Sequence, residues 1–464
     1  IVFLPRNMSE VILSADIGGT NTRLSLYEVV LSESFINMEL TKEEKLPGRL
    51  ILEKKYGNDK YDSLLEVISV FLKEANFGKV PTTACLAVAG PVTNNKATLT
   101  NREHWEIDGE TLAKALGLKR IQVVNDFVAM GFGLLTLNED TECVVLQKAK
   151  KNPTAPIACI GAGTGLGECF LTPKGDGNYE CYASEGGHAE FAPRNDVEIR
   201  LLHYLSKKFQ GKHRISIERV VSGPGLVNIY EFLSSQERPS DITPSIHQQI
   251  ISAPESDKAR IIAVNEEVCA VCAHTMRIFT AAYGAEAGVA ALKWIPTGGL
   301  YLTGGLTPKN IDYITGKKVG AEGLFIGALL DKGRVSPVLR NIPIYAVMVE
   351  DLGERGALYT ALRLLQEVGG KVPSTNQASV SCAAKNCPCG ANCTCGPNCA
   401  CGKSTPSSCT AKNCPCGANC TCGPNCACGS KCPSSSCAGK SLLIGAMLLA
   451  AMAAGACMIS KKRV

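Results

Sequence analysis

Two stretches of the chain, about 145 residues apart, show the same arrangement of apolar and polar positions. The first has the apolar run Val11–Ala15 before a glycine turn and the alternating run Thr22–Val29 after it. The second has Pro156–Ile160 and Glu168–Thr172 on either side of the glycine-rich segment 161–167. Such runs, interrupted by glycines, predict two strands joined by a tight turn. The repeat therefore predicts two similar half-domains in an α/β chain.

A further strand and helix are predicted between the two hairpins. Residues 121–125 form a short apolar run of strand type, and the apolar stretch 127–135 continues as a helix. Asp126 stands at their junction, the carboxyl end of the strand, where α/β proteins usually hold their sites. A third glycine turn, Thr303–Gly305, comes late in the chain.

The glycine turns are suited to binding phosphate. In Asp-Ile-Gly-Gly-Thr-Asn, residues 16–21, the N–H groups of Gly18 to Asn21 can face phosphate oxygens, and glycine has no side chain to block their approach. The chain lacks the Gly-Lys-Ser/Thr of a Walker loop, and the glycines of segment 161–167 do not have the spacing of a Rossmann fingerprint. Two phosphate turns with an aspartate between them indicate a phosphoryl-transfer enzyme.

Charge divides the chain near residue 370. All 43 acidic residues precede residue 382, whereas eight of the 48 basic residues follow it, so the net charge of +5 comes from the C-terminal part. The part of the chain before this point has about 370 residues. This is more than one hydrophobic core usually holds, which again favours two lobes. No basic stripe indicates nucleic acid. Residues 1–10 are expected to be an N-terminal extension. Because Ile1 opens the chain and Met8 directly precedes the first strand, residues 1–7 are expected to be a gene-model remnant, and seven residues are too short for a signal peptide.

In this order, the motifs resemble those of bacterial-type glucokinases, members of the actin-like ATPase and sugar kinase superfamily. The likeness runs from about Val11 to Leu365 and includes Glu-Gly-Gly-His-Ala-Glu-Phe-Ala-Pro at 185–193 and Ser-Gly-Pro-Gly-Leu-Val-Asn at 222–228. It implies a two-lobed α/β fold of the actin-like ATPase (ribonuclease H-like) type, with the active site in the cleft between the lobes. The expected small lobe covers residues 11–125 and the large lobe residues 126–369.

The same resemblance assigns the chemistry. Asp126 is the expected general base, which takes the proton of the 6-hydroxyl of glucose as that oxygen attacks the terminal phosphoryl group of ATP. Asp16 is the expected outer partner of Mg²⁺. The positions that match the family's substrate-binding residues are Asn101, Asn125, Asp126, Glu185, His188 and Glu218, and those that match its ATP-binding residues are Asp16, Gly18, Gly19, Thr20, Asn21, Gly163, Thr164, Gly165, Gly304 and Gly305.

Two departures from related families bear on this site. Repressor-like sugar kinases carry a cysteine-rich zinc motif just after the EGGH-type segment, whereas residues 190–195 contain no cysteine, so zinc is not expected in the catalytic core. The segment 100–105 is one residue longer than in some members of the family, which leaves the register of Asn101 open.

Cysteine-rich repeats follow the linker of residues 370–381. A 21-residue unit at Cys382–Gly402 recurs at Cys409–Gly429 with a single change. Residues 382–437 contain no Leu, Ile, Val, Met, His or aromatic residue, so they cannot fold around a hydrophobic core. Dense CxC thiolates favour Zn²⁺ or Cu⁺ binding instead, and the segment resembles a metallothionein. The candidate ligands are Cys382, Cys387, Cys389, Cys393, Cys395, Cys399, Cys401, Cys409, Cys414, Cys416, Cys420, Cys422, Cys426, Cys428, Cys432 and Cys437.

Disulfides and an unmetallated, lipidated spacer are the alternatives for these repeats. The kinase-like core holds seven further cysteines, mostly in apolar runs, which are expected to be reduced thiols and so favour a reducing compartment. They are Cys85, Cys143, Cys159, Cys169, Cys181, Cys269 and Cys272. In such a compartment, disulfides in the tail are not expected.

Residues 441–460 are uncharged and are followed by three basic residues. Twenty helical residues extend about 30 Å, the thickness of the hydrocarbon core of a bilayer. A tail anchor in an intracellular membrane is therefore expected, with the catalytic domain in the cytosol. A soluble or interfacial helix is the alternative, because Ala and Gly make the segment only moderately apolar. A glycosylphosphatidylinositol signal fits poorly, since it requires secretion.

The sequence thus predicts a membrane-tethered ATP:glucose phosphotransferase with a thiolate tail. Its expected partners are glucose, ATP, a membrane and a second copy in a homodimer, with no nucleic acid. The rivals are a kinase for a different hexose and a sugar-sensing or metal-buffering protein on an inactive kinase scaffold. Retention of Asp16, Asp126, the EGGH segment and both phosphate turns argues against an inactive core.

Overall fold

The structure, a computed structural model, describes residues 8–40, 45–99, 102–175, 178–210, 214–236 and 242–369, without the side chains of 102–104. The chain divides into two compact units, Ile1–Val372 and Pro373–Val464, and only the first contains described residues. The cysteine repeats, segment 441–460, residues 1–7 and Asn101 lie outside the described residues. Within them, no helix is both long enough and apolar enough to cross a membrane.

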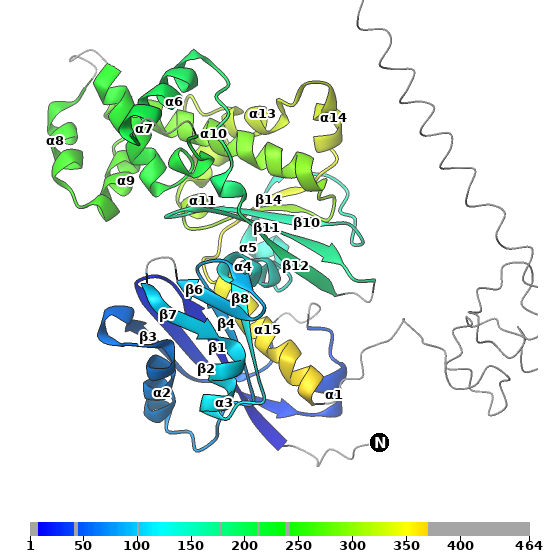
Figure 1. The fold of residues 1–464 in the computed structure, drawn as a ribbon. Helices are drawn as coiled ribbons and strands as arrows, with labels where there is room; N and C mark the ends of the chain where they lie inside the picture. The colour runs from blue at the N-terminus through cyan, green and yellow to red at the C-terminus, as the bar shows by residue number, and fades with distance from the viewer. Residues whose placement is uncertain are drawn as a thin grey trace, which may run out of the picture. The chain divides into compact units, whose positions relative to one another are not determined.

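A five-stranded sheet forms the first half of the described unit (Figure 1). Its strand order is β3-β2-β1-β4-β8; β2 is antiparallel to both β1 and β3, whereas β4 is parallel to both β1 and β8. The strands are β1 (Met8–Ile17), β2 (Asn21–Leu31), β3 (Arg49–Gly57), β4 (Thr83–Val88) and β8 (Arg120–Asn125). The strand, glycine turn and strand predicted around residues 16–21 are therefore confirmed as the β1–β2 hairpin.

Shorter elements accompany the first sheet. They are α1 (Glu33–Asn37), η2 (Asn58–Lys60), α2 (Leu64–Ala75), α3 (Gly109–Leu116) and a small antiparallel sheet of β5 (Val92–Thr93), β6 (Lys96–Leu99) and β7 (Arg102–Asp108). Side-chain caps fix two of the helix starts: Ser63 Oγ accepts from Glu66 N (3.2 Å) before α2, and Asp108 Oδ1 accepts from Glu110 N (3.0 Å) before α3.

The second sheet repeats the topology of the first. Its order is β12-β11-β10-β13-β14-β9, so an antiparallel β10–β11–β12 meander again continues into parallel β13 and β14. Only the additional edge strand β9 has no counterpart in the first sheet. The strands are β9 (Cys143–Gln147), β10 (Ile157–Ala162), β11 (Leu166–Pro173), β12 (Tyr179–Ser184), β13 (Leu300–Thr303) and β14 (Ile344–Val347). The two similar half-domains predicted from the repeated pattern are therefore confirmed.

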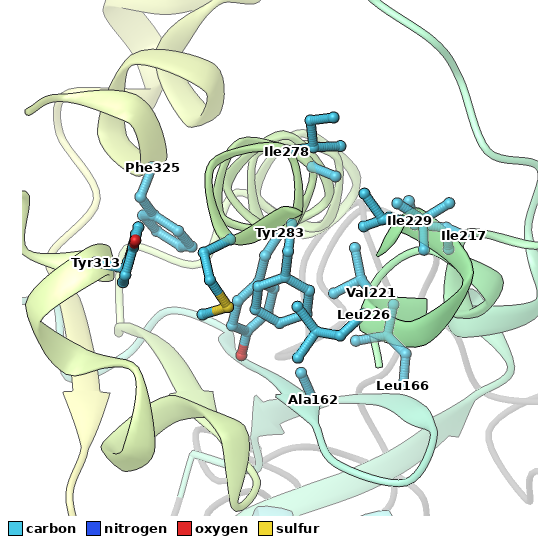
Figure 2. Packing of buried hydrophobic residues seen from close by; sticks show 14 of the residues in the cluster. Ala162, Leu166, Ile217, Val221, Leu226, Ile229, Ile278, Tyr283, Tyr313 and Phe325 are labelled. Carbon is cyan, nitrogen blue, oxygen red and sulfur yellow. The ribbon is translucent and has the colours of Figure 1, made fainter. Parts of the chain in front are cut away.

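Helices pack on the second sheet around one core. The long helix α10 contacts β10, and Tyr283 on it packs edge-on against Phe325, with ring centroids 5.5 Å apart (Figure 2). The helical elements of this half are α5 (Glu139–Glu142), η3 (Gly186–His188), α6 (Asp196–Lys208), η4 (Ile217–Arg219), α7 (Gly223–Gln236), α8 (Pro244–Ser252), α9 (Glu255–Val264), α10 (Ala270–Trp294), α11 (Leu306–Lys309), α12 (Ile311–Ile314), α13 (Leu324–Leu330), η6 (Gly333–Val335) and α14 (Ser336–Leu339).

Two helices, α4 (Asp126–Leu134) and α15 (Leu352–Val368), join the halves (Figure 1). A shared core contains buried side chains of both helices and of both sheets. α15 packs against β1 and β4, whereas α4 packs against α15, β11 and β12. The two helix backbones approach so closely at Gly356 that an added Cβ there would lie 1.6 Å from the carbonyl oxygen of Ala129. The lobe boundaries expected from the sequence, 11–125 and 126–369, stay a prediction; α15, at the end of the second range, packs against strands of the first sheet.

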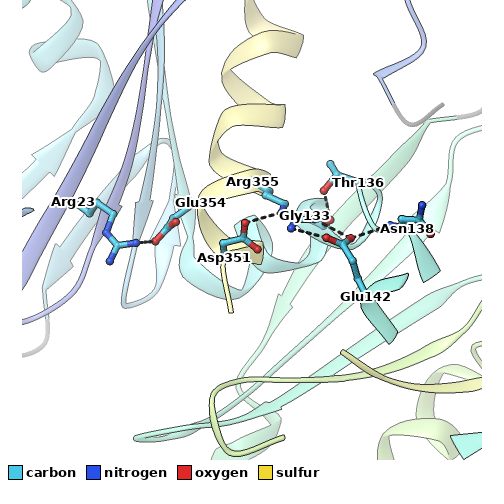
Figure 3. A network of polar contacts seen from close by, with 8 residues as sticks. All are labelled: Arg23, Gly133, Thr136, Asn138, Glu142, Asp351, Glu354 and Arg355. Carbon is cyan, nitrogen blue, oxygen red and sulfur yellow. Dashed lines mark hydrogen bonds and ion pairs between the residues drawn. The ribbon is translucent and has the colours of Figure 1, made fainter. Parts of the chain in front are cut away.

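A charged network fixes the start of α15 (Figure 3). Arg355 donates two hydrogen bonds to the carboxylate of Glu142 in α5, at 3.0 and 2.7 Å, and a third to Asp351 at 2.9 Å. The residue before Arg355, Glu354, pairs with Arg23 of β2. A bidentate Arg–carboxylate pair has defined geometry, so this network holds α15 between α5 and the first sheet.

Candidate active site

The first glycine turn follows β1. Gly18 N donates to Asn21 O at 2.9 Å, which closes the β1–β2 hairpin. Asp16 lies one residue from the end of β1, opposite Arg23 in the register, and its side chain is exposed. The protein around this side chain raises the pKa of Asp16 by desolvation, and the positive charges of Arg23 and Lys55 oppose this shift.

The predicted general base lies at the end of β8. Asn125 caps α4, since its Oδ1 accepts from the N–H groups of Phe127 and Val128 at 2.9 and 3.3 Å, and its Nδ2 donates to Gly90 O at 3.0 Å. Asp126 is the first residue of α4 and is half-buried. The strand and helix predicted around Asp126 are both confirmed.

Asp126 lies in an environment that favours a proton acceptor. Desolvation raises the pKa of Asp126 to about 6, and the charges of Asp16 and Glu185 add to this shift, while a hydrogen bond from Phe127 N opposes it. A general base works best when its pKa is near the operating pH. The structure therefore brings Asp16, Asp126 and Glu185, which come from three separate segments, into one electrostatic cluster.

The second glycine turn joins β10 and β11. Gly163 N donates to Gly165 O at 2.8 Å, and Gly223 N, at the start of α7, donates to Gly163 O at 2.8 Å. Glu218 of η4 accepts from Leu166 N at 2.9 Å. Glu218, which was predicted to bind sugar, is therefore also a structural partner of this turn.

The EGGH segment crosses the start of β11 as the 3-10 helix η3. Its glycines lie directly on the strand, because a Cβ on Gly186 would meet Glu168 Oε2 at 1.9 Å and one on Gly187 would meet Leu166 O at 1.9 Å. Glu185 and His188, on either side of these glycines, are exposed, with His188 Nε2 3.8 Å from Glu185 Oε2. Packing of the glycines thus presents both polar side chains to solvent.

The third glycine turn follows β13. Gly304 has a left-handed backbone (φ +79°), and a Cβ there would lie 2.4 Å from Ala162 O. Only glycine fits this position, so the turn packs against the last residue of β10. Gly305 then lies at the N-cap position, directly before α11. The second and third glycine turns are therefore in contact.

Three residues at this site were not predicted from the sequence. Asn58 is fully buried behind the first turn. The ring of Phe127 lies so close to β10 and β11 that a Cβ on Gly167 would be 1.9 Å from it. Glu168 is fully buried on β11, where neither carboxyl oxygen has a hydrogen-bond partner among the described residues. A Glu inside an apolar strand was the signal for Glu168, whereas Asn58 reads only as a turn residue.

Burial and the charge of Glu286 on α10 raise the pKa of Glu168 to about 7, and Lys293 opposes this shift. Glu286 is itself buried, and its pKa is also raised, mainly by desolvation. Two adjacent buried carboxyls are stable when at least one of them is protonated. Glu168 of this pair lies directly beneath Gly186 of the EGGH segment.

The residues present fit Mg²⁺ bound together with a nucleotide. Magnesium usually keeps several waters and is held by one or two carboxylates plus substrate phosphates. Asp16 offers an exposed carboxylate at the end of β1, near enough to Asp126 for their charges to interact. The described residues contain no cluster of three or more His, Cys, Asp or Glu suited to an all-protein metal site. Their seven cysteines are all free thiols, as predicted.

Known proteins share both the sequence and the fold. The glucokinase family matches residues 13–364. The glucokinases of Nostoc sp. strain PCC 7120 and Synechocystis sp. strain PCC 6803 are each 38% identical to this chain, over 365 and 362 residues, covering 76% and 75% of it and 99% and 97% of their own lengths. The crystal structure of a glucokinase from an Antarctic psychrotroph matches with a TM-score of 0.59 and 26% identity, over 76% of this chain and 99% of that one. The glucokinase of Balamuthia mandrillaris, solved in complex with glucose, matches in fold with a TM-score of 0.57 and 21% identity, over 76% of this chain and 94% of that one. With its two-lobed actin-like sugar kinase fold, this chain belongs to the glucokinase family.

Proposed function

We propose that this chain transfers the terminal phosphoryl group of ATP to the 6-hydroxyl of glucose, giving glucose 6-phosphate and ADP. The observation that carries the proposal is the half-buried carboxylate of Asp126 at the start of α4, clustered with Asp16 and Glu185. With its pKa raised to about 6, Asp126 is ionised at neutral pH and still basic enough to accept a proton.

In this mechanism, Asp126 takes the hydroxyl proton as the sugar oxygen attacks the γ-phosphorus. The bond from that phosphorus to the bridging oxygen of ADP breaks, and ADP leaves with the electron pair. Asp16 is the proposed partner of Mg²⁺, which neutralises phosphate charge when bound. N–H groups of the turns at 18–21 and 163–165 are proposed to orient the phosphates, and Gly304 and Gly305 to line the adenosine side.

The sugar is proposed to lie against the EGGH segment. The exposed side chains of Glu185 and His188 can hydrogen-bond ring hydroxyls. Glu218 in η4 and Asn125 at the cap of α4 are proposed to bind further hydroxyls. Asn101, which lies outside the described residues, completes the proposed set. A site built to pair hydroxyls rejects a sugar that leaves its polar groups unpaired.

Asp126→Asn tests the proposal. The amide keeps the shape and can still accept from Phe127 N, but it cannot take a proton, so kcat should fall by at least about 10²-fold while glucose binding remains measurable by calorimetry. Asp140→Asn makes the same change at an exposed carboxylate of α5 and should leave kcat unchanged. Near wild-type turnover by Asp126→Asn would remove Asp126 from the mechanism.

The rival proposals make different predictions for the wild-type protein. An inactive sugar-sensing or metal-buffering scaffold would bind glucose without forming glucose 6-phosphate. A kinase for another hexose would show a higher kcat/KM for that sugar in a coupled assay with a hexose panel. A glucose kinase should show its highest kcat/KM with glucose.

For the tail, the sequence alone supports our proposal. Residues 382–437 are proposed to bind several Zn²⁺ or Cu⁺ ions through their sixteen cysteines, independently of catalysis. Deleting them should leave kcat/KM unchanged, and native mass spectrometry of the reduced full chain expressed with zinc should show several bound metals. A spectrum without metal would defeat this reading.

Residues 441–460 are proposed to anchor the protein in an intracellular membrane with the kinase in the cytosol. Carbonate-washed membranes should retain the full chain, and a Leu448→Arg/Leu449→Arg variant should be released, since each central charge costs about 2.5 to 3.5 kcal/mol on insertion scales. Full release of the wild-type chain would exclude the anchor. A homodimer remains part of the proposal, and the mass from light scattering tests it.

A further inference from the structure

Asn58 contacts the first glycine turn at three points. It begins η2, directly after β3, and its side chain is fully buried. Its Nδ2 donates to the carbonyl oxygen of Gly18 at 2.8 Å, and its backbone N donates to the carbonyl oxygen of Thr20 at 2.9 Å. Its Oδ1 accepts from the hydroxyl of Thr22 at 2.8 Å. One buried residue therefore spans the turn from Gly18 to Thr22.

These contacts determine where the N–H groups of the turn point. In a trans peptide the C=O and the N–H of the same unit point in opposite directions. The carbonyl of Gly18 shares its peptide unit with Gly19 N–H, and the carbonyl of Thr20 shares its unit with Asn21 N–H. Because Asn58 holds both carbonyls on one side, both N–H groups are turned to the opposite side. Gly19 N–H donates no hydrogen bond within the described residues.

We propose that Asn58 is a positioning residue of the nucleotide site: it holds the backs of two peptide units so that Gly19 and Asn21 present their N–H groups to a phosphate of ATP. Thr22 assists by binding Oδ1 of Asn58, which directs Nδ2 toward Gly18 O. The inference rests on the proposed function, specifically on the assignment of the first turn to ATP phosphates.

The chemistry of the position favours an amide. Asn58 must donate to a carbonyl and accept from a hydroxyl through two atoms of one planar group, which Asn supplies. An Asp there would place a buried carboxylate oxygen against Gly18 O. An Ala would leave Gly18 O and the fully buried Thr22 Oγ1 without this partner, and a buried group that loses its hydrogen bond without regaining water is costly.

Asn58 could instead serve only to fasten the hairpin to β3, and a matched residue distinguishes the two roles. Gln366 on α15 is also a buried amide, donating to Phe35 O at 2.7 Å and Met38 O at 3.1 Å. Gln366 lies on no glycine turn and on none of the segments proposed to bind substrate. Truncating it removes comparable buried hydrogen bonds without touching the nucleotide site.

The experiment compares Asn58→Ala, Asn58→Asp and Gln366→Ala in the full chain. We measure KM for ATP and for glucose, the Kd of a non-hydrolysable ATP analogue by calorimetry, and Tm. We call the contacts of the Asn58 side chain with Gly18 O and Thr22 Oγ1 the brace of the first turn. Its loss should raise KM for ATP and Kd for the analogue by about 10-fold in both Asn58 variants. KM for glucose should stay within about two-fold of wild type. Gln366→Ala should lower Tm and leave both KM values unchanged.

Thr22→Val keeps the experiment decisive if the Asn58 variants do not fold. It removes only the hydroxyl that orients Asn58, and it should raise Kd for the analogue by about three-fold without changing KM for glucose. An equal rise in both KM values would overturn the proposal, as would unchanged analogue binding in folded Asn58 and Thr22 variants.

The binding measurement also separates this inference from the proposed function. If the wild-type chain binds the analogue but transfers no phosphoryl group to any hexose, the proposed function fails. Weaker analogue binding by the Asn58 variants would still support the brace in that case. If transfer is normal and the Asn58 variants bind the analogue like wild type, only the inference fails.

Discussion

The two glycine hairpins occupy the same place in two sheets of the same topology, but opposite chemistry holds each turn. Behind the β1–β2 turn, Asn58 donates to two carbonyl oxygens. Beside the β10–β11 turn, Glu218 accepts the N–H of Leu166. The first turn thereby keeps Gly19 N–H available on its other side, whereas in the second Gly163 N–H and Leu166 N–H are both engaged and a carboxylate lies next to the turn. The first turn is therefore the better site for an anion.

The hairpins also differ at the second pair of facing residues, counted from the turn. In the first, this pair is Asp16 and Arg23, both charged. In the second, it is Gly161 and Gly167, and the ring of Phe127 occupies the space that side chains would fill. The same backbone pattern thus carries a charged pair in one half and makes room for the residue that follows Asp126 in the other.

One further step along the ladders, Leu24 in the first hairpin corresponds to Glu168 in the second, and both are fully buried. The first half buries an apolar side chain there, while the second buries one of two adjacent carboxyls. Equivalent backbone positions therefore tolerate very different chemistry when the elements packed on them differ.

The largest effect should come from adding a side chain at Gly167, where the ring of Phe127 already occupies the space. A Cβ on Gly167 would lie 1.9 Å from the ring of Phe127, so Gly167→Ala should lower the free energy of unfolding by about 3 kcal/mol, measured by chemical denaturation. The displaced ring should also lower kcat, because Phe127 adjoins Asp126. Gly353→Ala, where nothing lies within 4 Å, is the control and should change stability by less than about 0.5 kcal/mol. Equal stability of the two variants would show that Phe127 can move away freely.

An effect of similar size is expected from removing the ionisation of Glu168, which is fully buried on β11. The pKa of Glu168 rises from its ordinary value of 4.5 to about 7 on folding, so the folded state binds more protons between these values and stability falls as pH rises through this window. Glu168→Gln removes this ionisation and should gain about 3 kcal/mol over wild type on going from pH 4.5 to pH 8. Denaturation at both pH values measures the difference.

A substitution at Glu286 provides a second check on the Glu168–Glu286 pair. Glu286→Gln relieves the same repulsion from α10 and should also flatten the pH dependence. If the Glu168 and Glu286 variants both lose stability with pH as steeply as wild type, the two carboxyls do not titrate in this range.

The smallest effect should come from the brace of the second turn. Glu218→Ala leaves Leu166 N–H without its acceptor and should lower the free energy of unfolding by about 1 kcal/mol. Glu218→Gln keeps an acceptor oxygen and should lose less. Both are measured by urea denaturation beside Asn58→Ala, and a Gln variant as unstable as the Ala variant would mean that charge, and not the hydrogen bond, holds this turn.

The sequence by itself determined the local parts of the fold and the site. Both hairpins, the strand before Asp126 and the helix after it follow from apolar alternation and glycine turns, which depend only on neighbouring residues. The order of the motifs also sufficed to identify the family. The motif order also identified Asp16, Asp126 and the EGGH segment as site residues. That these segments lie close together in space was expected only from the resemblance.

Only the tertiary structure decided what lies behind these local parts. Asn58 lies 40 residues from Gly18 in the chain, and α15 contacts β1 only after more than 300 residues have intervened. Glu168 meets Glu286 because α10 packs on the second sheet, and no feature of the sequence pairs the two residues. Braces, buried charges and close helix crossings depend on which surfaces meet, and a pattern with a period of two or 3.6 residues carries no information about the surface on the other side.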